Sequence, residues 1–362
     1  MKIDGKTSHN SPFIRFPEFT GEWEYFSIND VCSEFKSGKN IKADLISSNG
    51  NFPVYGGNGL RGYTSSYNHD GLYVLIGRQG ALCGNVRSVF GKIYITEHAI
   101  AVAGNEKSDT YFLHYLFLKM NLGQYSDQSA QPGLAVNKLL KLKVLLPSIS
   151  EQIKIAKLLS LLDERIAVQS RLIEDLKKLR CAVSNKLFQS VKGVVIPLSG
   201  ISNIVKGKQI NGDFLADVGE YYVMNGGTEP SGYYDNYNVE ANTISISEGG
   251  NSCGYVQFNR MPFWSGGHCY TIQDIVSDVE TLYLYHYLKS KEDSIMKLRI
   301  GTGLPNIQKK DLAEFKVIIP AIEQQRTISN ILSLLERKTE IEGRMLIAMR
   351  TEKQYLLHQM FI

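Results

Sequence analysis

Two long stretches of the chain carry apolar residues at the spacing of an amphipathic helix. From Ile155, alternating steps of four and three residues reach Leu159, Leu162, Ile166, Gln169, Ile173, Leu176, Arg180, Val183 and Leu187. From Ile328, the same steps reach Leu332, Leu335, Thr339, Glu342, Leu346, Met349, Lys353, Leu356 and Met360. Mostly apolar positions at this spacing, over about five heptads, are typical of a coiled-coil seam. We predict two long helices, in which polar seam residues such as Gln169 and Arg180 fix the register.

The second helical stretch is a copy of the first. The segments LPSISEQIKIAKLLSLLDERI (146–166) and IPAIEQQRTISNILSLLERKT (319–339) share the core LSLL, and Leu162 and Leu335 are 173 residues apart. Further segments recur at shifts of 169 to 173 residues: GALCGNV (80–86) with GNSCGYV (250–256), TEHAI (96–100) with GGHCY (266–270), and KVLLP (143–147) with KVIIP (316–320). This pattern indicates a tandem duplication of one domain plus one helix, with about 20 N-terminal residues outside it.

Each copy begins with a Gly- and Tyr-rich part, in which short β-like runs alternate with Gly and Asn turns. The predicted strands are 71–77, 92–97, 242–247, 255–259 and 315–320, and the predicted aromatic core helices are 111–120 and 281–290. The fold class is therefore α/β (α+β): two tandem domains of mixed short strands and helices, each followed by a long helix. The predicted boundaries are a tail at 1–20, a domain at 21–147, a helix at 148–190, a domain at 191–320 and a helix at 321–362.

Each exposed seam needs a partner, which could be the other copy, a second chain or the helix's own domain. The duplication favours the other copy, in an antiparallel coiled coil with pseudo-two-fold symmetry and one domain at each end. Two similar but divergent domains at a fixed distance suit a ligand with two sites at a fixed spacing. Duplex DNA is such a ligand, because its successive major-groove faces lie ~34 Å apart.

Composition narrows the class of protein only slightly. The chain has 362 residues, 43% of them apolar, and a formal net charge of +4, which is compatible with nucleic acid as a ligand. Its five cysteines are scattered without a Cys-x-x-Cys pair, so neither a zinc ribbon nor a disulfide framework is indicated. The polar start MKIDGKTSHNSP lacks the apolar core of a signal peptide, and no run is long enough to span a membrane. We predict a cytoplasmic protein with no membrane partner.

The motifs of catalysis are missing from the sequence. It contains no [DNS]-P-P-[YF] methyltransferase motif and no G-x-x-x-x-G-K-[ST] phosphate loop. The repeated pairs Cys83/His98 and Cys253/His268 could be a thiolate with its base or two metal ligands. Neither pair has a third group that recurs in both copies, so small buried cysteines and hydrogen-bonded core histidines are the favoured roles. We predict neither a catalytic nor a metal site; an enzyme that uses these pairs is the alternative.

The order of these segments resembles the specificity (S) subunit of type I restriction–modification systems. RFPEFTGEW (15–23) is similar to the entry to the first target-recognition domain in that family. The pattern Pro-x-x-x-Glu-Gln before the first helix (147–152) resembles its helical spacer, and after Pro320 the Glu-Gln pair stands one residue earlier. The TGLPN segment (302–306) before the KVIIP strand is also typical. The resemblance covers residues 15–362, with every motif present in order.

This resemblance implies separate roles for the two domains, the helices and the partner subunits. Each target-recognition domain reads one half of a bipartite asymmetric DNA site, and the helices set the gap and dock modification subunits. Two modification (M) subunits methylate adenine with S-adenosylmethionine, and restriction (R) subunits add ATP- and Mg-dependent translocation and cleavage. The S subunit itself has no chemistry and no cofactor. The alternative is a silent or phase-variable specificity allele that acts only as a scaffold.

Base reading by such domains needs Arg or Lys for guanine and Asn or Gln for adenine, while phosphates take Lys and Arg. The expected DNA contacts of the first domain are Lys36, Ser37, Lys39, Asn40, Asn58, Arg61, Arg78, Gln79, Asn85 and Arg87, with the loop Gln128 to Gln131. Those of the second domain are Lys206, Lys208, Gln209, Asn225, Thr228, Asn251, Gln257, Arg260, Arg299 and Thr302. A solvated loop residue is the alternative for each.

Some of these positions match between the copies but differ in side chain. Arg78-Gln79 corresponds to Glu248-Gly249, Arg61 to Ser231, and Asn85 to Tyr255. A shared scaffold with altered loop side chains suits two readers of two different half-sites. Contacts to M subunits are expected on the outward helix faces, at Lys154, Lys157, Arg165 and Arg171, although these charges also fit a solvated face.

Overall fold

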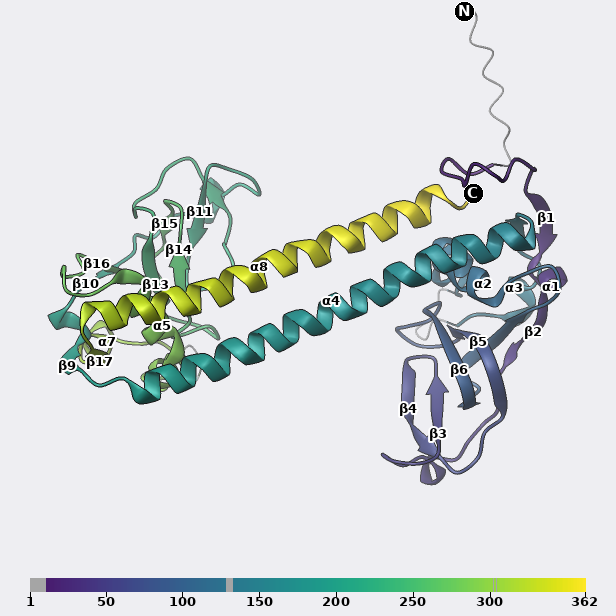
Figure 1. Ribbon diagram of the computed structural model, residues 1–362, viewed down its shortest axis with the longest axis horizontal. Helices are drawn as coiled ribbons and strands as arrows, with labels where there is room; N and C mark the ends of the chain where they lie inside the picture. The colour runs from purple at the N-terminus through teal and green to yellow at the C-terminus, as the bar shows by residue number, and fades with distance from the viewer. Residues whose placement is uncertain (1–10, 128–132, 302, 304) are drawn as a thin grey trace, which may run out of the picture. The chain divides into compact units, whose positions relative to one another are not determined.

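The chain folds into two compact units, each combining an α/β domain with parts of two long helices (Figure 1). The computed structural model describes residues 11–127, 133–301, 303 and 305–362. The first unit comprises the described residues up to Ser170 together with Met345–Ile362, and the second lies within Arg171–Arg344. The long helices α4 (Ile149–Ser190) and α8 (Ile322–Gln359) each contribute residues to both units.

A six-stranded sheet in the order β2-β7-β5-β6-β3-β4 forms the base of the first unit. Its strands are β2 (Cys32–Ser37), β3 (Phe52–Gly56), β4 (Gly59–Thr64), β5 (His69–Gly77), β6 (Val86–Ile95) and β7 (Ala99–Gly104). Paired strands run antiparallel except β3 and β6, which are parallel. A separate antiparallel pair joins β1 (Glu24–Ser27) to β8 (Lys143–Leu146). The shorter helices are α1 (Ile28–Val31), α2 (Thr110–Met120) and α3 (Val136–Leu139), with 3₁₀ turns η1 (Ala43–Leu45) and η2 (Leu122–Tyr125).

The second unit repeats this plan with smaller sheets, in the orders β10-β16-β13-β14, β12-β11-β15 and β17-β9. Its strands are β9 (Val194–Pro197), β10 (Asn203–Lys206), β11 (Tyr221–Met224), β12 (Tyr233–Tyr234), β13 (Thr243–Ser247), β14 (Val256–Asn259), β15 (Trp264–Ser265), β16 (Cys269–Gln273) and β17 (Lys316–Ile319). Its shorter helices are α5 (Thr281–Ser290), α6 (Glu292–Met296) and α7 (Lys309–Ala313), with 3₁₀ turns η3 (Leu198–Gly200) and η4 (Gly212–Phe214).

The aromatic helices α2 and α5 pack as their sequences predict. Each is capped by the carboxylate before it: Asp109 accepts the backbone N–H of Phe112 at 2.8 Å, and Glu280 accepts that of Tyr283. The rings of Phe112 and Tyr283 are fully buried in the cores of their own units. The predicted strands fall within or overlap β5, β6, β13, β14 and β17, but β6 begins six residues before the predicted run, at Val86. In its first half the buried residues Val86 and Val89 are three positions apart, so the period-two pattern that predicts a strand is absent there although the segment pairs with β5.

Within each unit, a segment of α4 packs antiparallel to a segment of α8. In the first unit Ile155 lies in one core with Met360, while Asp163, further along α4, bonds to Lys353, earlier on α8. In the second unit the Arg180 guanidinium donates to Glu336 at 3.2 Å, and the more C-terminal Phe188 lies in one core with Ile328, earlier on α8. All the predicted seam positions are buried or half-buried, which confirms the heptad pattern. No helix of the described residues is long and apolar enough to cross a membrane.

A buried glutamine ties the start of each long helix to its own domain. The Gln152 side chain accepts the backbone N–H of Asp109 and donates to the carbonyls of Lys107 and Pro147, each at 2.9 Å. Gln325 makes the same set of bonds in the second unit, to Glu280, Asp278 and Pro320. Because both glutamines are fully desolvated, each bond replaces one that water would otherwise provide.

These bonds correct our alignment of the Pro-x-x-x-Glu-Gln motif with the residues after Pro320. Gln325, five residues after Pro320, takes the place of Gln152, so the second copy is not shifted by one residue. The difference lies at the preceding position, where Gln324 is exposed but Glu151 is buried. Glu151 accepts two bonds of 2.7 Å from the guanidinium of Arg15, a residue of the N-terminal segment that lies outside the repeat.

Each unit also buries one histidine against its helix pair. Burial lowers the pKa of His114 to about 4, and the nearby ammonium of Lys353 acts in the same direction. Burial likewise lowers the pKa of His286 to about 4, supported by Arg180 and Arg260. The His286 Nε2 lies 2.9 Å from the hydroxyl of Ser333 on α8. Both rings are therefore neutral in the folded chain at pH 7.

We expect these histidines to make the folded chain sensitive to acid. Between pH 6.5 and 4 the unfolded chain binds more protons than the folded one, so stability falls as the pH is lowered through this window. The loss should be on the order of 2 kcal/mol per histidine by pH 5. Denaturant unfolding at pH 7 and pH 5 should show a smaller acid loss for His114→Gln with His286→Gln than for the unsubstituted chain. Equal losses in the two proteins would contradict this account.

Candidate nucleic-acid interface

The first unit has an open hollow of about 420 Å³ at the turns that follow β3 and β5. Its lining is Gly56, Gly57, Asn58, Arg61, Gln79, Gly80 and His98. Three of the predicted DNA-contacting residues, Asn58, Arg61 and Gln79, are therefore gathered in one place, and all three are exposed. The hollow presents one guanidinium and two carboxamides, the groups that recognise guanine and adenine edges.

Glycines allow the chain to close around this hollow. A Cβ on Gly57 would lie 2.7 Å from the carbonyl oxygen of His98, and one on Gly56 would lie 2.8 Å from the Arg61 Cδ. Gly59 has φ +103, a conformation that side chains other than glycine rarely adopt, and the Arg87 guanidinium lies against it. A larger residue at Gly57 would displace the backbone at His98, whereas one at Gly56 would displace the Arg61 side chain.

The backbone beneath the hollow is repeated in the second unit. In the first unit Arg78 N–H donates to the His98 carbonyl, while the Arg78 carbonyl accepts from Leu134 N–H and from the thiol of Cys83. In the second unit Glu248 makes the corresponding bonds with His268, Ile307 and Cys253. None of these bonds uses the side chain of Arg78 or Glu248. One framework therefore carries a cation in one unit and a carboxylate in the other.

Side chains fill the second unit differently around this framework. Asn225 stands where the first unit has Gly56, and its carboxamide oxygen accepts the His268 backbone N–H at 3.1 Å. Lys206 pairs with Glu248 at 2.7 Å, and the Tyr270 hydroxyl donates to the same carboxylate oxygen at 3.0 Å. Two residues predicted to contact DNA thus have partners inside the domain, which the sequence alone did not indicate.

The remaining predicted residues differ in exposure. Those exposed to solvent in the first unit are Lys36, Lys39, Asn40, Asn58, Arg61, Gln79, Asn85 and Arg87. Those exposed in the second unit are Lys206, Lys208, Gln209, Thr228, Asn251, Arg260 and Arg299. Ser37, Arg78, Asn225 and Gln257 are half-buried. Thr302 and the loop Gln128 to Gln131 lie outside the described residues.

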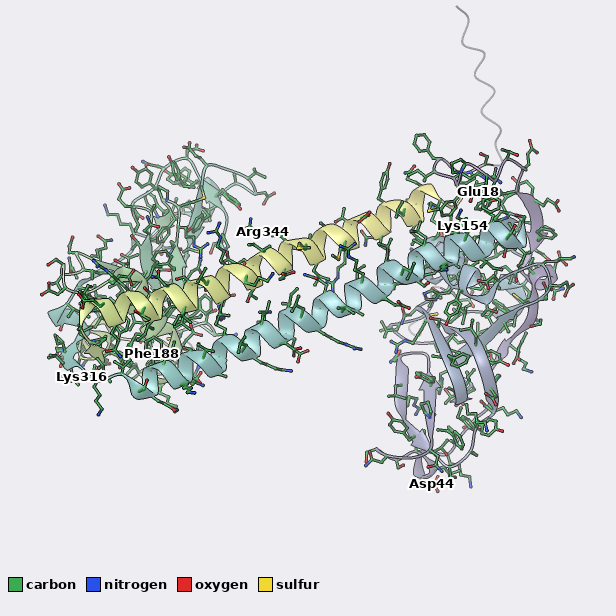
Figure 2. The ribbon with its side chains drawn as sticks, viewed as in Figure 1. Glu18, Asp44, Lys154, Phe188, Lys316 and Arg344 are labelled. Carbon is green, nitrogen blue, oxygen red and sulfur yellow. The ribbon has the colours of Figure 1, made fainter. Side chains whose placement is uncertain are left out.

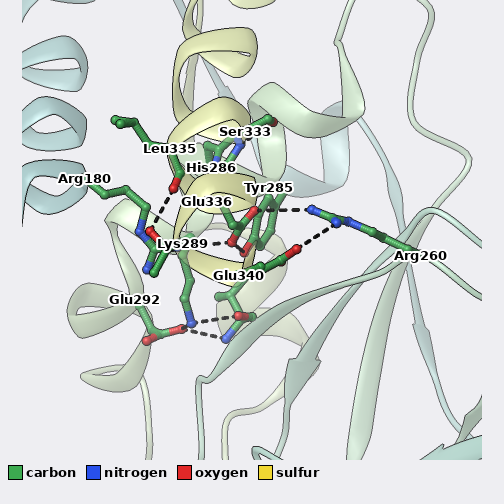
Figure 3. Close-up of polar contacts among 12 residues, drawn as sticks. Arg180, Arg260, Tyr285, His286, Lys289, Glu292, Ser333, Leu335, Glu336 and Glu340 are labelled. Atoms are coloured by element: carbon green, nitrogen blue, oxygen red, sulfur yellow. Dashed lines mark hydrogen bonds and ion pairs between the residues drawn. The ribbon is translucent and has the colours of Figure 1, made fainter. Parts of the chain in front are cut away.

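Besides Lys206, three of the predicted basic contacts are engaged by nearby acids, and in the first of these the Lys36 ammonium lies 3.2 Å from Glu34. The Arg260 guanidinium meets Glu340 at 3.2 Å and Glu336 at 3.9 Å, both on α8 (Figure 3). Lys154, which we expected to face an M subunit, pairs instead with Glu18 of the N-terminal segment (Figure 2). Its ammonium also lies over the Phe16 ring, 4.5 Å from the centroid.

The repeated cysteines have a structural role, whereas the repeated histidines are not core residues. Each cysteine thiol donates to a framework carbonyl, and burial raises the pKa of both thiols, which disfavours a thiolate. Contrary to our expectation of core histidines, His98 is only half-buried and His268 is exposed. His98 Nδ1 lies 3.1 Å from Gln79 Oε1, so it belongs to the hollow, a role that its recurrence in both copies could have suggested. Within the described residues, no three His, Cys, Asp or Glu side chains are grouped to hold a metal ion.

Comparison with known proteins gives matches to one family in both halves of the chain. The domain described as "Type I restriction modification DNA specificity domain" matches residues 20–178 and again residues 191–348. The type I restriction enzyme EcoprrI specificity subunit of Escherichia coli is 50% identical over 112 residues, which are 31% of this chain and 28% of that protein. A putative type I specificity subunit of Mycoplasma pneumoniae is 31% identical over 45% of this chain and 44% of its own length. The matches thus span less than half the length of these two relatives.

Two further matches extend along nearly the whole chain. A putative type I restriction enzyme specificity subunit of Haemophilus influenzae is 24% identical over 92% of this chain and 93% of its own length. The crystal structure of a type I restriction–modification system S subunit from M. genitalium superposes with a TM-score of 0.78 at 22% identity. It covers 97% of this chain and 99% of that one, which shows a common fold.

We expect the framework cysteines to be chemically inert. Cys181 on α4 is exposed, whereas Cys253 is fully buried and its thiol pKa is raised. With iodoacetamide at pH 7.5, mass spectrometry of the folded chain should detect label on Cys181 well before Cys253, because the thiolate is the reacting form. Denatured chain, in which both thiols react, is the control. Rapid labelling of folded Cys253 would instead favour a reactive thiol.

Proposed function

The chain belongs to the family of type I restriction–modification DNA specificity domains, and we propose that it is the subunit that selects the DNA sequence on which such a complex acts. Each α/β domain reads one half of a bipartite, asymmetric site in duplex DNA. The observation that carries this proposal is the repeated backbone framework with Arg78 in one unit and Glu248 in the other. A common frame with different side chains suits two readers of different half-sites.

In the first domain we assign base reading to the hollow. Arg61 can donate two bonds to a guanine edge, and Asn58 or Gln79 can bond bidentately to adenine. The exposed cations Lys36, Lys39 and Arg87 supply phosphate contacts, with Ser37, Asn40, Arg78 and Asn85 beside them. The surrounding glycine turns let the backbone approach the duplex closely.

In the second domain the exposed loop residues Lys208, Gln209, Thr228, Asn251 and Arg299 are the proposed contacts. Lys206 forms an ion pair with Glu248, and Asn225 and Gln257 are half-buried. We therefore place these three residues at the edge of the interface. Thr302 remains a candidate outside the described residues. We leave Arg260 out because its guanidinium is held by α8.

We propose that α4 and α8 form the spacer that fixes the gap between the half-sites. In each unit an acid on one helix meets a base on the other: Asp163 with Lys353, and Glu336 with Arg180. These residues are equivalent under the 173-residue repeat, which is what an antiparallel coiled coil between duplicated helices requires. Polar pairs inside a seam fix its register at some cost in stability.

A second apolar row on these helices offers a docking surface for partner subunits. Leu161, Val168 and Leu172 on α4 are 53%, 64% and 40% exposed. Their equivalents under the same shift, Leu334, Ile341 and Met345 on α8, are 67%, 43% and 41% exposed. Spacings of seven and four residues suit a partner helix, and the repetition suits two copies of one partner.

We therefore propose that two modification subunits dock on these rows, with Lys157, Arg165 and Arg171 beside them. Restriction subunits would join the same complex. S-adenosylmethionine, ATP and Mg²⁺ would be used by these partners, and the chain itself would recognise DNA in the cytoplasm without catalysing a reaction.

Genomic methylation tests the reading function directly. Single-molecule sequencing of DNA from cells that express this chain with its M subunit should show a split motif with N6-methyladenine in both halves. Arg61→Ala should relax or weaken one half-site alone, by about 1–3 kcal/mol of discrimination for a lost bidentate contact. Lys138→Ala, which removes an exposed ion pair with Asp127 in the same unit, is the matched control. If the S–M complex forms but no methylated motif is found, the result indicates a silent allele. If no S–M complex forms, the result contradicts the proposal.

The docking rows can be tested through stoichiometry. Val168→Asp and Ile341→Asp each place a charge in one row, and exposed positions tolerate such a change in the isolated chain. Native mass spectrometry of the co-expressed complex should show two M subunits for the unsubstituted chain and one for either variant. Gln354→Glu, at an exposed position on a different face of α8, should retain two. Two bound M subunits in all variants would exclude these rows as the docking surface.

A further inference from the structure

One carboxylate in the second unit is contacted by three different elements. Glu336 of α8 accepts from the Arg180 guanidinium of α4 at 3.2 Å and from the Tyr285 hydroxyl of α5 at 2.8 Å. The Arg260 guanidinium approaches its other oxygen at 3.9 Å (Figure 3). The Glu336 side chain is only 16% exposed, so these contacts are partly shielded from water. The carboxylate thus connects the helix pair with the recognition domain.

Arg260 connects the strand layer to this cluster. It directly follows β14, the edge strand of the sheet β10-β16-β13-β14. Its second partner is Glu340, at 3.2 Å and one helical turn beyond Glu336. Carboxylates four residues apart lie on the same helix face, so one guanidinium can bridge both. The sheet edge is thereby fixed to α8 at a point separate from the Gln325 contacts at the start of that helix.

The first unit has the helix contacts but different residues at the positions of this bridge. Asp163 accepts from the Tyr115 hydroxyl at 2.9 Å and bonds to Lys353, as Glu336 does with Tyr285 and Arg180. The shift that aligns Cys83 with Cys253 places Phe90 at the position of Arg260, and Phe90 is 78% exposed. The helix shift places Ala167 at the position of Glu340. Phenylalanine and alanine cannot form this ion pair.

We propose that Arg260 is a positioning residue that holds the second recognition domain in one orientation on its helix segments, and so makes the complex strict about the gap between half-sites. The inference rests on the proposed DNA-reading function. Changing the gap by one base pair moves a half-site by ~3.4 Å and turns it by about a tenth of a helical turn. The Gln325, Tyr285 and His286 contacts fix the α5 side of the domain to α8. The Arg260 bridge fixes the sheet edge as well, so the domain resists that movement more than it would without the bridge.

The test compares DNA duplexes that differ only in gap length. The probes carry the split motif found by methylome sequencing, with the native gap, one base pair fewer, or one base pair more. Binding of each duplex to the S–M complex gives a ratio of native-gap to altered-gap affinity. For Arg260→Ala we expect this ratio to fall about two- to fivefold, the effect of one half-exposed ion pair, with base preferences in both half-sites unchanged.

A charge exchange distinguishes a positioning role of Arg260 from general damage to the domain. Either change alone should lower the ratio, and Arg260→Glu combined with Glu340→Arg should restore part of it, because the Glu336 carboxylate still faces position 260. Lys178→Ala, which removes the exposed Lys178–Glu174 pair on α4, should leave the ratio unchanged. An unchanged ratio in Arg260→Ala, or equal weakening on all three duplexes, overturns the positioning role. If the unsubstituted complex binds no split motif, the proposed function fails, and this inference fails with it.

Discussion

The structure depends on burying an apolar seam that is flanked on each long helix by one carboxylate. Asp163 and Glu336 lie on the two long helices, and each is satisfied by a base from the other helix and a tyrosine from α2 or α5. A partly buried carboxylate that loses its partners costs more free energy than a surface ion pair contributes. The helix register and the docking of each α/β domain are therefore set by the same groups, and a shift in one would disrupt the other.

Each α/β domain combines a shared backbone frame with side chains that differ between the two copies. Backbone hydrogen bonds around positions 78 and 248 hold the loops in both units, while the side chains at those positions differ. Gly56 leaves the hollow open in the first unit, and Asn225 occupies the corresponding place in the second. Under the proposed function, this arrangement lets one fold serve two half-sites, because the frame contributes shape and the loops contribute donors and acceptors.

Elements with a short-range repeat of apolar residues could be predicted from the sequence, whereas side-chain pairs between distant residues could not. The heptads of both long helices, the aromatic helices α2 and α5 and the apolar strand β5 follow from local periodicity, which burial of one face produces directly. The hollow was anticipated only as separate loops, since their meeting depends on glycine contacts across the sheet. Arg260 and Lys206 look like free cations in sequence, and their partners Glu340 and Glu248 lie 80 and 42 residues away. No local pattern encodes such pairs.

The repeated framework also affects how readily this chain can evolve. Because the bonds at Arg78 and Glu248 run through backbone atoms, a substitution there leaves that part of the scaffold intact. Substitutions of exposed loop residues such as Arg61 and Gln79 can therefore accumulate with little penalty in folding, whereas the buried carboxylate of Glu248 is held by Lys206 and Tyr270. Under the proposed function, duplication gives one gene two such domains, and a substitution that abolishes reading by one domain leaves reading by the other unchanged.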